Sequence, residues 1–293
     1  MKQFVNRIVR RIVADQLKKH SYIHIDEFTR PYIIQKNTEG VDFLFSIGDH
    51  HARLYYDLYC TDPVWIEMRF IRDNLVHPGD VVIECGSHHG CTTILLANWV
   101  GPEGSVYAYE PGRHNFEILK ENMSLNNISN VHAINAAVGS GTSVVNFTEF
   151  ENNSMGSKVV PNETGHNLKR AMTYEIDQVS LDTYKSVRPS LIKIDTQGYI
   201  YQPLLGLKRI IAEQKPNLAL EIDGKKEIEQ YGNNFEAIFE IIEQNEYSYF
   251  VQFEEDREPE QIEFSKILTE WDIRNNFNKE IHLYAKNSVR FSQ

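Results

Sequence analysis

The sequence is poor in the features that mark secreted or membrane-spanning proteins. It has only three cysteines in 293 residues, Cys60, Cys85 and Cys91, too few for a disulfide framework and typical of a reducing compartment. No window approaches the roughly 18 consecutive apolar residues of a transmembrane helix. The N-terminus mixes charged and apolar residues without a continuous apolar stretch, so no signal peptide is expected. A cytoplasmic protein is therefore predicted.

Basic residues are scarce relative to acidic ones. The chain has 30 Lys and Arg against 41 Asp and Glu, which gives a net charge of −11. Phosphate backbones repel such a chain, so nucleic acid is not an expected partner. No repeat and no low-complexity tract is present, and 41% hydrophobic with 24% charged residues is ordinary for a folded globular protein.

The first 77 residues are expected to form an N-terminal extension. Residues 3–20 carry apolar side chains at three- and four-residue spacing with basic residues on other faces, which predicts an amphipathic helix. This helix packs on the main body or on a second subunit, or it lies on a membrane surface. Two short strands are expected at 31–35 and 41–47, and a helix from residue 62 to about residue 76.

Residues 78–293 are expected to form the main domain, in which short apolar strands alternate with helices. Such alternation indicates βαβ units and a parallel sheet, and the last two strands suit an antiparallel edge. The polar stretch 139–175 is expected to be irregular. The expected strands are 81–83, 105–109, 131–136, 191–194, 217–222, 247–253 and 280–285, and the expected helices are 90–99, 115–126, 201–213, 225–244 and 264–275.

The turn between the first buried strand and its helix has the composition of a nucleotide site. Gly86 allows a tight turn, and Gly90 lets the helix start lie close to the sheet or to a ligand. Glu110 ends the next strand, where a carboxylate would hold both hydroxyls of a ribose. An adenosine-containing ligand is therefore predicted, and it requires a cavity between Gly86 and Glu110. The alternative is a structural turn with a surface glutamate.

With these residues in place, the chain resembles the FkbM family of S-adenosylmethionine-dependent methyltransferases. The resemblance covers about residues 64–223 and rests on short segments whose order and spacing are specific. It implies a Rossmann-like class I methyltransferase fold, with a seven-stranded, mostly parallel sheet and an antiparallel edge strand. It also implies S-adenosylmethionine as cofactor and O-methylation of a sugar, glycan or secondary metabolite. The matched segments are 78–90, 101–111, 119–122 with 125–126, 135–139, 180–184, 191–195 with Gly198, and 216–223.

The resemblance also implies which residues bind the donor. They lie at strand ends and in the turns that follow, with Glu110 at the ribose and Asp195 facing the methyl group. The two positions after Ser87 depart from the family, which commonly has Asn at the first and rarely His at the second. The implied set is Glu84, Gly86, Ser87, His88 and Gly90 at the amino-acid end, Glu110 with Pro111 at the ribose, Asn135 and Ala136 at the adenine, and Asp195 at the methyl group.

A neutral hydroxyl acceptor must lose a proton, which calls for a base within hydrogen-bond reach. The expected catalytic residues are Asp195, which ends a central strand, and His88 and His89, which titrate near neutrality. Glu221 and Asp223 are weaker candidates, more typical of a structural role.

After Asp195 the family commonly has two glutamates, and Gln197 and Ile200 stand in their places here. The base has therefore moved or been lost, so a binding or regulatory protein without catalysis is the alternative. A nicotinamide dehydrogenase is a third interpretation, disfavoured because the turn lacks the Gly-x-Gly-x-x-Gly spacing.

Three further segments have two interpretations each. The run Asp49-His50-His51 with Asp57 suggests a metal site, but neighbours in one loop seldom converge on an ion, so no metal is expected. The aromatic run from Tyr55 and Tyr56 through Tyr59 to Trp65 either lines an acceptor pocket or packs the extension onto the sheet. Residues 152–157 form a lid or a surface connector.

Overall fold

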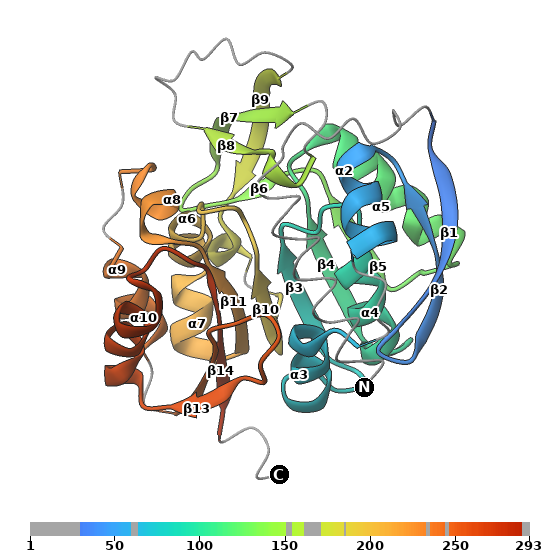
Figure 1. The fold of residues 1–293 in the computed structure, drawn as a ribbon. Coiled ribbons are helices and arrows are strands. Elements are labelled where there is room, and N and C mark those ends of the chain that lie inside the picture. The colour runs from blue at the N-terminus through green and yellow to red at the C-terminus, as the bar shows by residue number, and fades with distance from the viewer. Residues whose placement is uncertain are drawn as a thin grey trace.

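An eight-stranded mixed sheet lies at the centre of the computed structural model, with the strand order β13-β12-β14-β11-β10-β3-β4-β5 (Figure 1). The structure describes residues 30–59, 64–150, 154–160, 171–184, 186–232, 235–243 and 246–288. The amphipathic helix expected at residues 3–20 lies outside these ranges, so its contact with a membrane or a second subunit stays a prediction.

Five parallel strands form one continuous part of this sheet. Helices cover both of its faces, which explains why the strands read as short, almost wholly apolar runs. The chain runs from β3 out to β5 and then returns past β3 to β10, so the strand order reverses between β3 and β10. Open α/β sheets bind ligands at the carboxyl ends of strands beside such a reversal. The strands are β3 (Val81–Cys85), β4 (Ser105–Tyr109), β5 (Val131–Ile134), β10 (Leu191–Ile194) and β11 (Asn217–Ile222).

Antiparallel strands complete the sheet. β14 (Ile281–Asn287) lies between β11 and β12 (Tyr247–Gln252) and is antiparallel to both, while β13 (Glu260–Ile262) adds an antiparallel edge. The predicted Rossmann-like architecture is confirmed, with one strand more than the seven expected. The additional strand, β13, is short and mostly exposed, and it therefore lacks the apolar pattern by which strands are recognised in a sequence.

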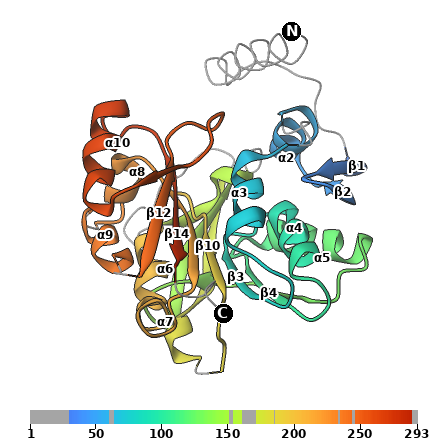
Figure 2. The ribbon, with the colours of Figure 1, turned by 90° about the horizontal axis from the view of Figure 1, so that it is seen from below.

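Two groups of helices enclose the sheet, one on each face (Figure 2). The expected helices at 201–213 and 225–244 are each divided, the first at Leu207 and the second near Gly232, whose φ of 70° is not helical. None of the helices in the described ranges is both long and apolar enough to cross a bilayer. One face carries α3 (Ile66–Asn74), α4 (Cys91–Val100) and α5 (Arg113–Leu125), and the other α6 (Tyr201–Gly206), α7 (Lys208–Gln214), α8 (Lys225–Glu229), α9 (Ala237–Ile242) and α10 (Ile267–Asn275).

The N-terminal extension begins with a hairpin of β1 (Tyr32–Thr38) and β2 (Val41–Ile47). Glu39 and Gly40 both have positive φ, 49° and 79°, as a two-residue hairpin turn with the right-handed strand twist requires. The inward side chains of β2 share one apolar core with α3, α4 and β3. The extension is therefore packed onto the sheet, while the proposed boundary between residues 77 and 78 stays a prediction.

After β2 the chain forms a short helix, α2 (His50–Ala52), that continues as a π-helix over Arg53–Tyr59. Tyr56 is buried there, and its ring packs edge-on against Phe45 of β2 at a centroid distance of 4.8 Å. Trp65 is partly buried against the same core. These contacts favour the packing interpretation of the aromatic run.

The polar stretch 139–175 is not irregular, as the sequence suggested, but carries most of a second sheet. This four-stranded sheet has the order β6-β9-β7-β8 and lies above the central sheet in Figure 1. One of its faces covers a small core that includes Phe147, Ile176 and Tyr199. Its strands therefore bury side chains on one side only. The solvent-facing residues of these strands are polar, so no continuous apolar run marked them in the sequence. The strands are β6 (Ala137–Val138), β7 (Ser143–Phe150), β8 (Lys158–Val160) and β9 (Ala171–Val179).

Candidate active site

The turn between β3 and α4 depends on its two glycines for packing. A Cβ on Gly86, whose φ is 88°, would lie 1.7 Å from the carbonyl oxygen of Asp195, at the end of β10. A Cβ on Gly90 would lie 2.5 Å from Cδ1 of Leu119 on α5. Gly86 thus allows two strand ends to approach, and Gly90 lets α4 start against α5. Packing between these chain segments therefore requires a glycine at both positions.

Glu110 lies beside this turn, as the sequence predicted. Its Oε2 accepts a hydrogen bond from the backbone N–H of His88 (2.8 Å), and its Oε1 accepts one from the N–H of Gly112 (2.8 Å). The side-chain amide of Asn115 lies 3.3 Å from the same Oε1. The side chain is almost fully buried, and burial raises its pKa to about 7. Glu110 therefore connects the turns after β3 and β4.

His88 closes the space above Glu110. Its φ is 49°, and its ring lies between Tyr56 and Ser154, with Nδ1 3.0 Å from the tyrosine Oη and Nε2 3.1 Å from the serine Oγ. The carbonyl of Ser154 also accepts a hydrogen bond from Asn115 (3.4 Å). Among the described residues, His88, Asn115 and Ser154 therefore lie around the buried Glu110 carboxylate.

Ser154 begins a short 3-10 turn, Ser154–Gly156, within the segment expected to be a lid or a connector. We call residues 154–156 the cover turn. The cover turn contacts His88 and Asn115, both of which hydrogen-bond to Glu110.

Two predicted donor-site residues are engaged in packing. Both carboxylate oxygens of Glu84 accept hydrogen bonds from hydroxyls of α4, those of Thr92 and Thr93. The Glu84 side chain is fully buried, and burial raises its pKa. Ser87 is also buried, and its N–H donates to the Tyr109 carbonyl (3.1 Å). Glu84 thus anchors the start of α4 and turns no carboxylate oxygen toward the sheet edge.

The residues predicted to border the adenine do lie beside Glu110. Asn135 follows β5 and is exposed, and its amide donates to the carbonyls of Glu110 (2.8 Å) and Pro111 (3.0 Å). Ala136 is buried next to it. The ends of β4 and β5 are therefore held together at the position the sequence predicted.

Asp195 lies on the other side of Gly86, at the reversal of strand order. Its side chain is 31% exposed, and its Oδ2 lies 3.5 Å from Nζ of Lys193. Lys193 itself is buried within β10, which disfavours its charge, but Asp195, Glu67 and other carboxylates together raise its pKa. Lys193 was not among the predicted site residues, although a lysine in an otherwise apolar buried strand was a usable signal.

The positions of the two missing family glutamates are occupied by structural residues. Gln197 has a φ of 52°, and its carbonyl lies 3.4 Å from the Tyr231 hydroxyl that donates to it. Ile200 is fully buried in the core. Nearby, Asp223 accepts a hydrogen bond from the N–H of Gly198 (2.5 Å), and burial raises its pKa to about 7. Burial and the neighbouring carboxylates also raise the pKa of Glu221 well above its usual range.

His89 points away from Asp195 and toward the N-terminal extension. Its ring is fully buried and stacks on His88 at a centroid distance of 4.0 Å. Its Nε2 lies 3.3 Å from Oδ2 of Asp49, which is equally close to Nε2 of His114 on α5. Asp57 takes no part, since it accepts a hydrogen bond from Tyr32 (2.5 Å). No sequence motif joined His114 to Asp49, because they meet only through tertiary packing.

Comparisons with solved structures give weak overall similarity. A methyltransferase FkbM from Methylobacillus flagellatus KT is 17% identical with a TM-score of 0.43, over 74% of this chain and 50% of that chain, so the present chain spans half of its length. An rRNA methylase from Streptococcus thermophilus is 13% identical (TM-score 0.41, 75% and 93% covered). An S-adenosylmethionine-dependent O-methyltransferase from Thermotoga maritima is 14% identical (TM-score 0.40, 87% and 77% covered).

The family comparison is specific. The methyltransferase FkbM domain matches residues 84–249, more than half of the chain, from the last part of β3 into β12. This range includes the turn after β3, Glu110, Asp195 and the second sheet. The predicted family is thereby confirmed: the chain belongs to the FkbM methyltransferase domain family.

Proposed function

We propose that this protein transfers the methyl group of S-adenosylmethionine to a hydroxyl group of a small molecule or glycan. The observation that carries the proposal is the buried Glu110 carboxylate, held at the end of β4 by the turn after β3. A buried acid at the carboxyl edge of a parallel sheet is suited to bind the two hydroxyls of a ribose. The net charge of −11 favours a small or uncharged acceptor over RNA. A cytoplasmic location is part of the same proposal.

The residues fit the donor in kind and in position. Glu110 would hold the ribose, Asn135 and Ala136 would border the adenine, and the backbone from Gly86 to His88 would face the amino-acid end. When bound, the sulfonium supplies an activated methyl carbon. Because Ser154 and His88 lie beside Glu110, we expect the donor to displace the hydrogen bond between them and so to compete with the cover turn.

Asp195 is the best candidate for the base. It lies next to Gly86, and its carboxylate is partly exposed, so it can accept a proton from a bound hydroxyl while Lys193 orients it. His89 is fully buried beside Asp49 and does not reach this edge. His88 is engaged through both ring nitrogens, and burial lowers its pKa, which makes it a gating residue more than a base.

A binding protein without catalysis is the second candidate. It is favoured by Gln197 and Ile200, which place a turn and a core residue where the family commonly has glutamates. The two candidates share the donor site and differ only in turnover, so they are separated by activity and not by affinity.

Isothermal titration calorimetry with S-adenosylmethionine tests the shared donor site. Glu110→Gln is expected to weaken binding roughly 10-fold or more, since a hydrogen bond to a charged group contributes about 1.5–3 kcal/mol. The matched control is Glu121→Gln, which changes an exposed glutamate on α5. Equal affinity in both variants would refute the ribose assignment.

Transfer of a labelled methyl group to a library of hydroxyl compounds tests the chemistry. Asp195→Asn is expected to reduce the turnover rate at least 10²-fold, within the range of general-base effects, while donor affinity changes little. Normal turnover by Asp195→Asn would show that another group accepts the proton of the acceptor hydroxyl. Donor binding by the wild type with no transfer to any compound would favour the binding protein.

A further inference from the structure

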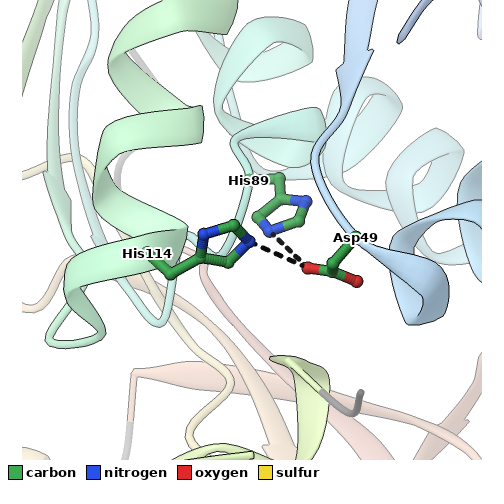
Figure 3. Close-up of side chains that lie close together, drawn as sticks. All are labelled: Asp49, His89 and His114. Atoms are coloured by element: carbon green, nitrogen blue, oxygen red, sulfur yellow. Dashed lines mark hydrogen bonds and ion pairs between the residues drawn. The ribbon is translucent and has the colours of Figure 1, made fainter. Parts of the chain in front are cut away.

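Three potential metal ligands converge where the N-terminal extension meets the main domain (Figure 3). Asp49 caps α2, His89 belongs to the turn after β3, and His114 lies in the first turn of α5. They come from three separate parts of the chain, so their meeting is a product of the fold. One ligand atom from each lies within 4.8 Å of the others.

The distances match those between the ligands of one tetrahedral ion. Nε2 of His89 and Nε2 of His114 each lie 3.3 Å from the same carboxylate oxygen, Oδ2 of Asp49. Bonds of about 2.0–2.1 Å to a tetrahedral zinc ion place neighbouring ligand atoms roughly 3.3 Å apart. Each imidazole Nε2 therefore already lies at the distance from Oδ2 of Asp49 that a shared ion would set.

An unsatisfied buried side chain gives an independent indication of a ligand. The side chain of His89 is fully buried, and neither of its ring nitrogens makes a hydrogen bond of ordinary geometry. Leaving buried polar atoms unpaired is costly, typically about 1–3 kcal/mol each. Its Nε2 lies 3.3 Å from Oδ2 of Asp49, within ion-pair distance but outside hydrogen-bond geometry, and an ion between them would satisfy that nitrogen.

Neighbouring groups fix the orientation of one ligand and leave another exposed to solvent. The other carboxylate oxygen of Asp49, Oδ1, accepts a hydrogen bond from the N–H of Ala52 (2.8 Å), which fixes the orientation of the carboxylate. The side chain of His114 is 46% exposed, so one side faces solvent. Three protein ligands and an open side are typical of zinc sites that keep a fourth position for water or a substrate atom.

We propose that Asp49, His89 and His114 bind a divalent transition-metal ion of the zinc type, with the fourth position open to solvent. Two imidazoles and one carboxylate form a donor set that binds such ions in preference to Mg²⁺ or Ca²⁺. The ion joins the extension, through Asp49, to the turn after β3 and to α5. This site adjoins the proposed donor site through the turn after β3, where His89 stacks on His88, and ion binding does not depend on methyl transfer.

The test uses the full chain, stripped with a chelator and reloaded with Zn²⁺ alone. We expect one ion per chain by mass spectrometry of the metal content, and a dissociation constant measurable by competition with a chromophoric chelator. Loading with Co²⁺ is expected to give the intense visible absorption of a tetrahedral site. A wild-type protein that retains no ion above the buffer background would overturn the proposal.

His114→Ala is the informative variant, because this half-exposed residue can be removed without opening the core. We expect it to weaken Zn²⁺ binding at least 10-fold, and Asp49→Asn to do the same. The matched control is His132→Ala, which removes an exposed histidine on β5 and leaves the affinity unchanged. Circular dichroism confirms folding of each variant. Equal Zn²⁺ affinity in His114→Ala and the wild type would show that these three side chains form only a hydrogen-bonded cluster.

Discussion

Single residues carry much of the geometry at the carboxyl edge of the sheet. Gly86 lets the ends of β3 and β10 approach, and Glu110 ties the turns after β3 and β4 together. His88 adopts a left-handed conformation that is uncommon for a side chain with a Cβ. Its backbone N–H binds Glu110 while its ring binds Ser154. One strained residue thus connects the predicted donor site to the second sheet.

We expect Gly86→Ala to lower the free energy of unfolding by about 3 kcal/mol or more. The added Cβ adopts an unfavourable φ and also collides with the Asp195 carbonyl. Gly79→Ala is the matched control, since Gly79 has nearly the same φ, 87°, with nothing within 4 Å of the added atom. It is expected to cost about 1–2 kcal/mol. Urea unfolding measures both, and equal losses would show that the strand ends can separate.

Among the elements, the cover turn contacts two residues that surround Glu110. Its Ser154 contacts the His88 ring through Oγ and Asn115 through its carbonyl. It follows β7, so the second sheet positions it. The cover turn therefore links the second sheet to the acid proposed to bind the ribose.

Ser154→Ala is expected to tighten donor binding roughly 2- to 10-fold. The variant loses a hydrogen bond of about 0.5–1.5 kcal/mol that exists only in the closed form, so the open form becomes more populated. Stopped-flow fluorescence should show faster association as well. Ser157→Ala is the control, because its hydroxyl accepts from the Phe150 N–H and not from His88. Identical association rates and affinities in the two variants would mean that the cover turn does not limit binding.

For the molecule as a whole, buried charges fasten the extension to the central sheet. Glu67 on α3 lies 3.8 Å from Nζ of Lys193 in β10 and 3.7 Å from Nδ1 of His282 in β14. Burial disfavours the ionised carboxylate, but the charges of His282 and Lys193 outweigh it and lower the pKa of Glu67 to about 2. The extension is therefore held by ion pairs as well as by apolar packing.

This ion pair predicts how stability depends on pH. The pKa of Glu67 is lower in the folded protein than its ordinary value of 4.5, so its contribution is complete above pH 4.5 and is lost as the pH falls to about 2. The contribution is about 3 kcal/mol. In Glu67→Gln we expect lower stability at neutral pH and a smaller loss on acidification, measured by urea unfolding at pH 6 and pH 3. A wild-type-like acid dependence in this variant would contradict the assignment.

The parallel strands, the fold class and the place of Glu110 were readable from the sequence. Short apolar runs, glycine turns and an acid at a strand end are local patterns, and each marks an element before any packing is known. β10 and β11 were predicted to the residue. The second sheet was not, because half of each of its strands is polar.

Contacts between distant segments needed the folded chain. Ser154 meets His88 across 66 residues, and Asp49 meets His114 across 65. Lys193 lies among carboxylates contributed by other elements. No local pattern encodes such meetings, because they depend on how the helices and the two sheets pack. The closed donor site and the proposed metal site are for that reason properties of tertiary packing.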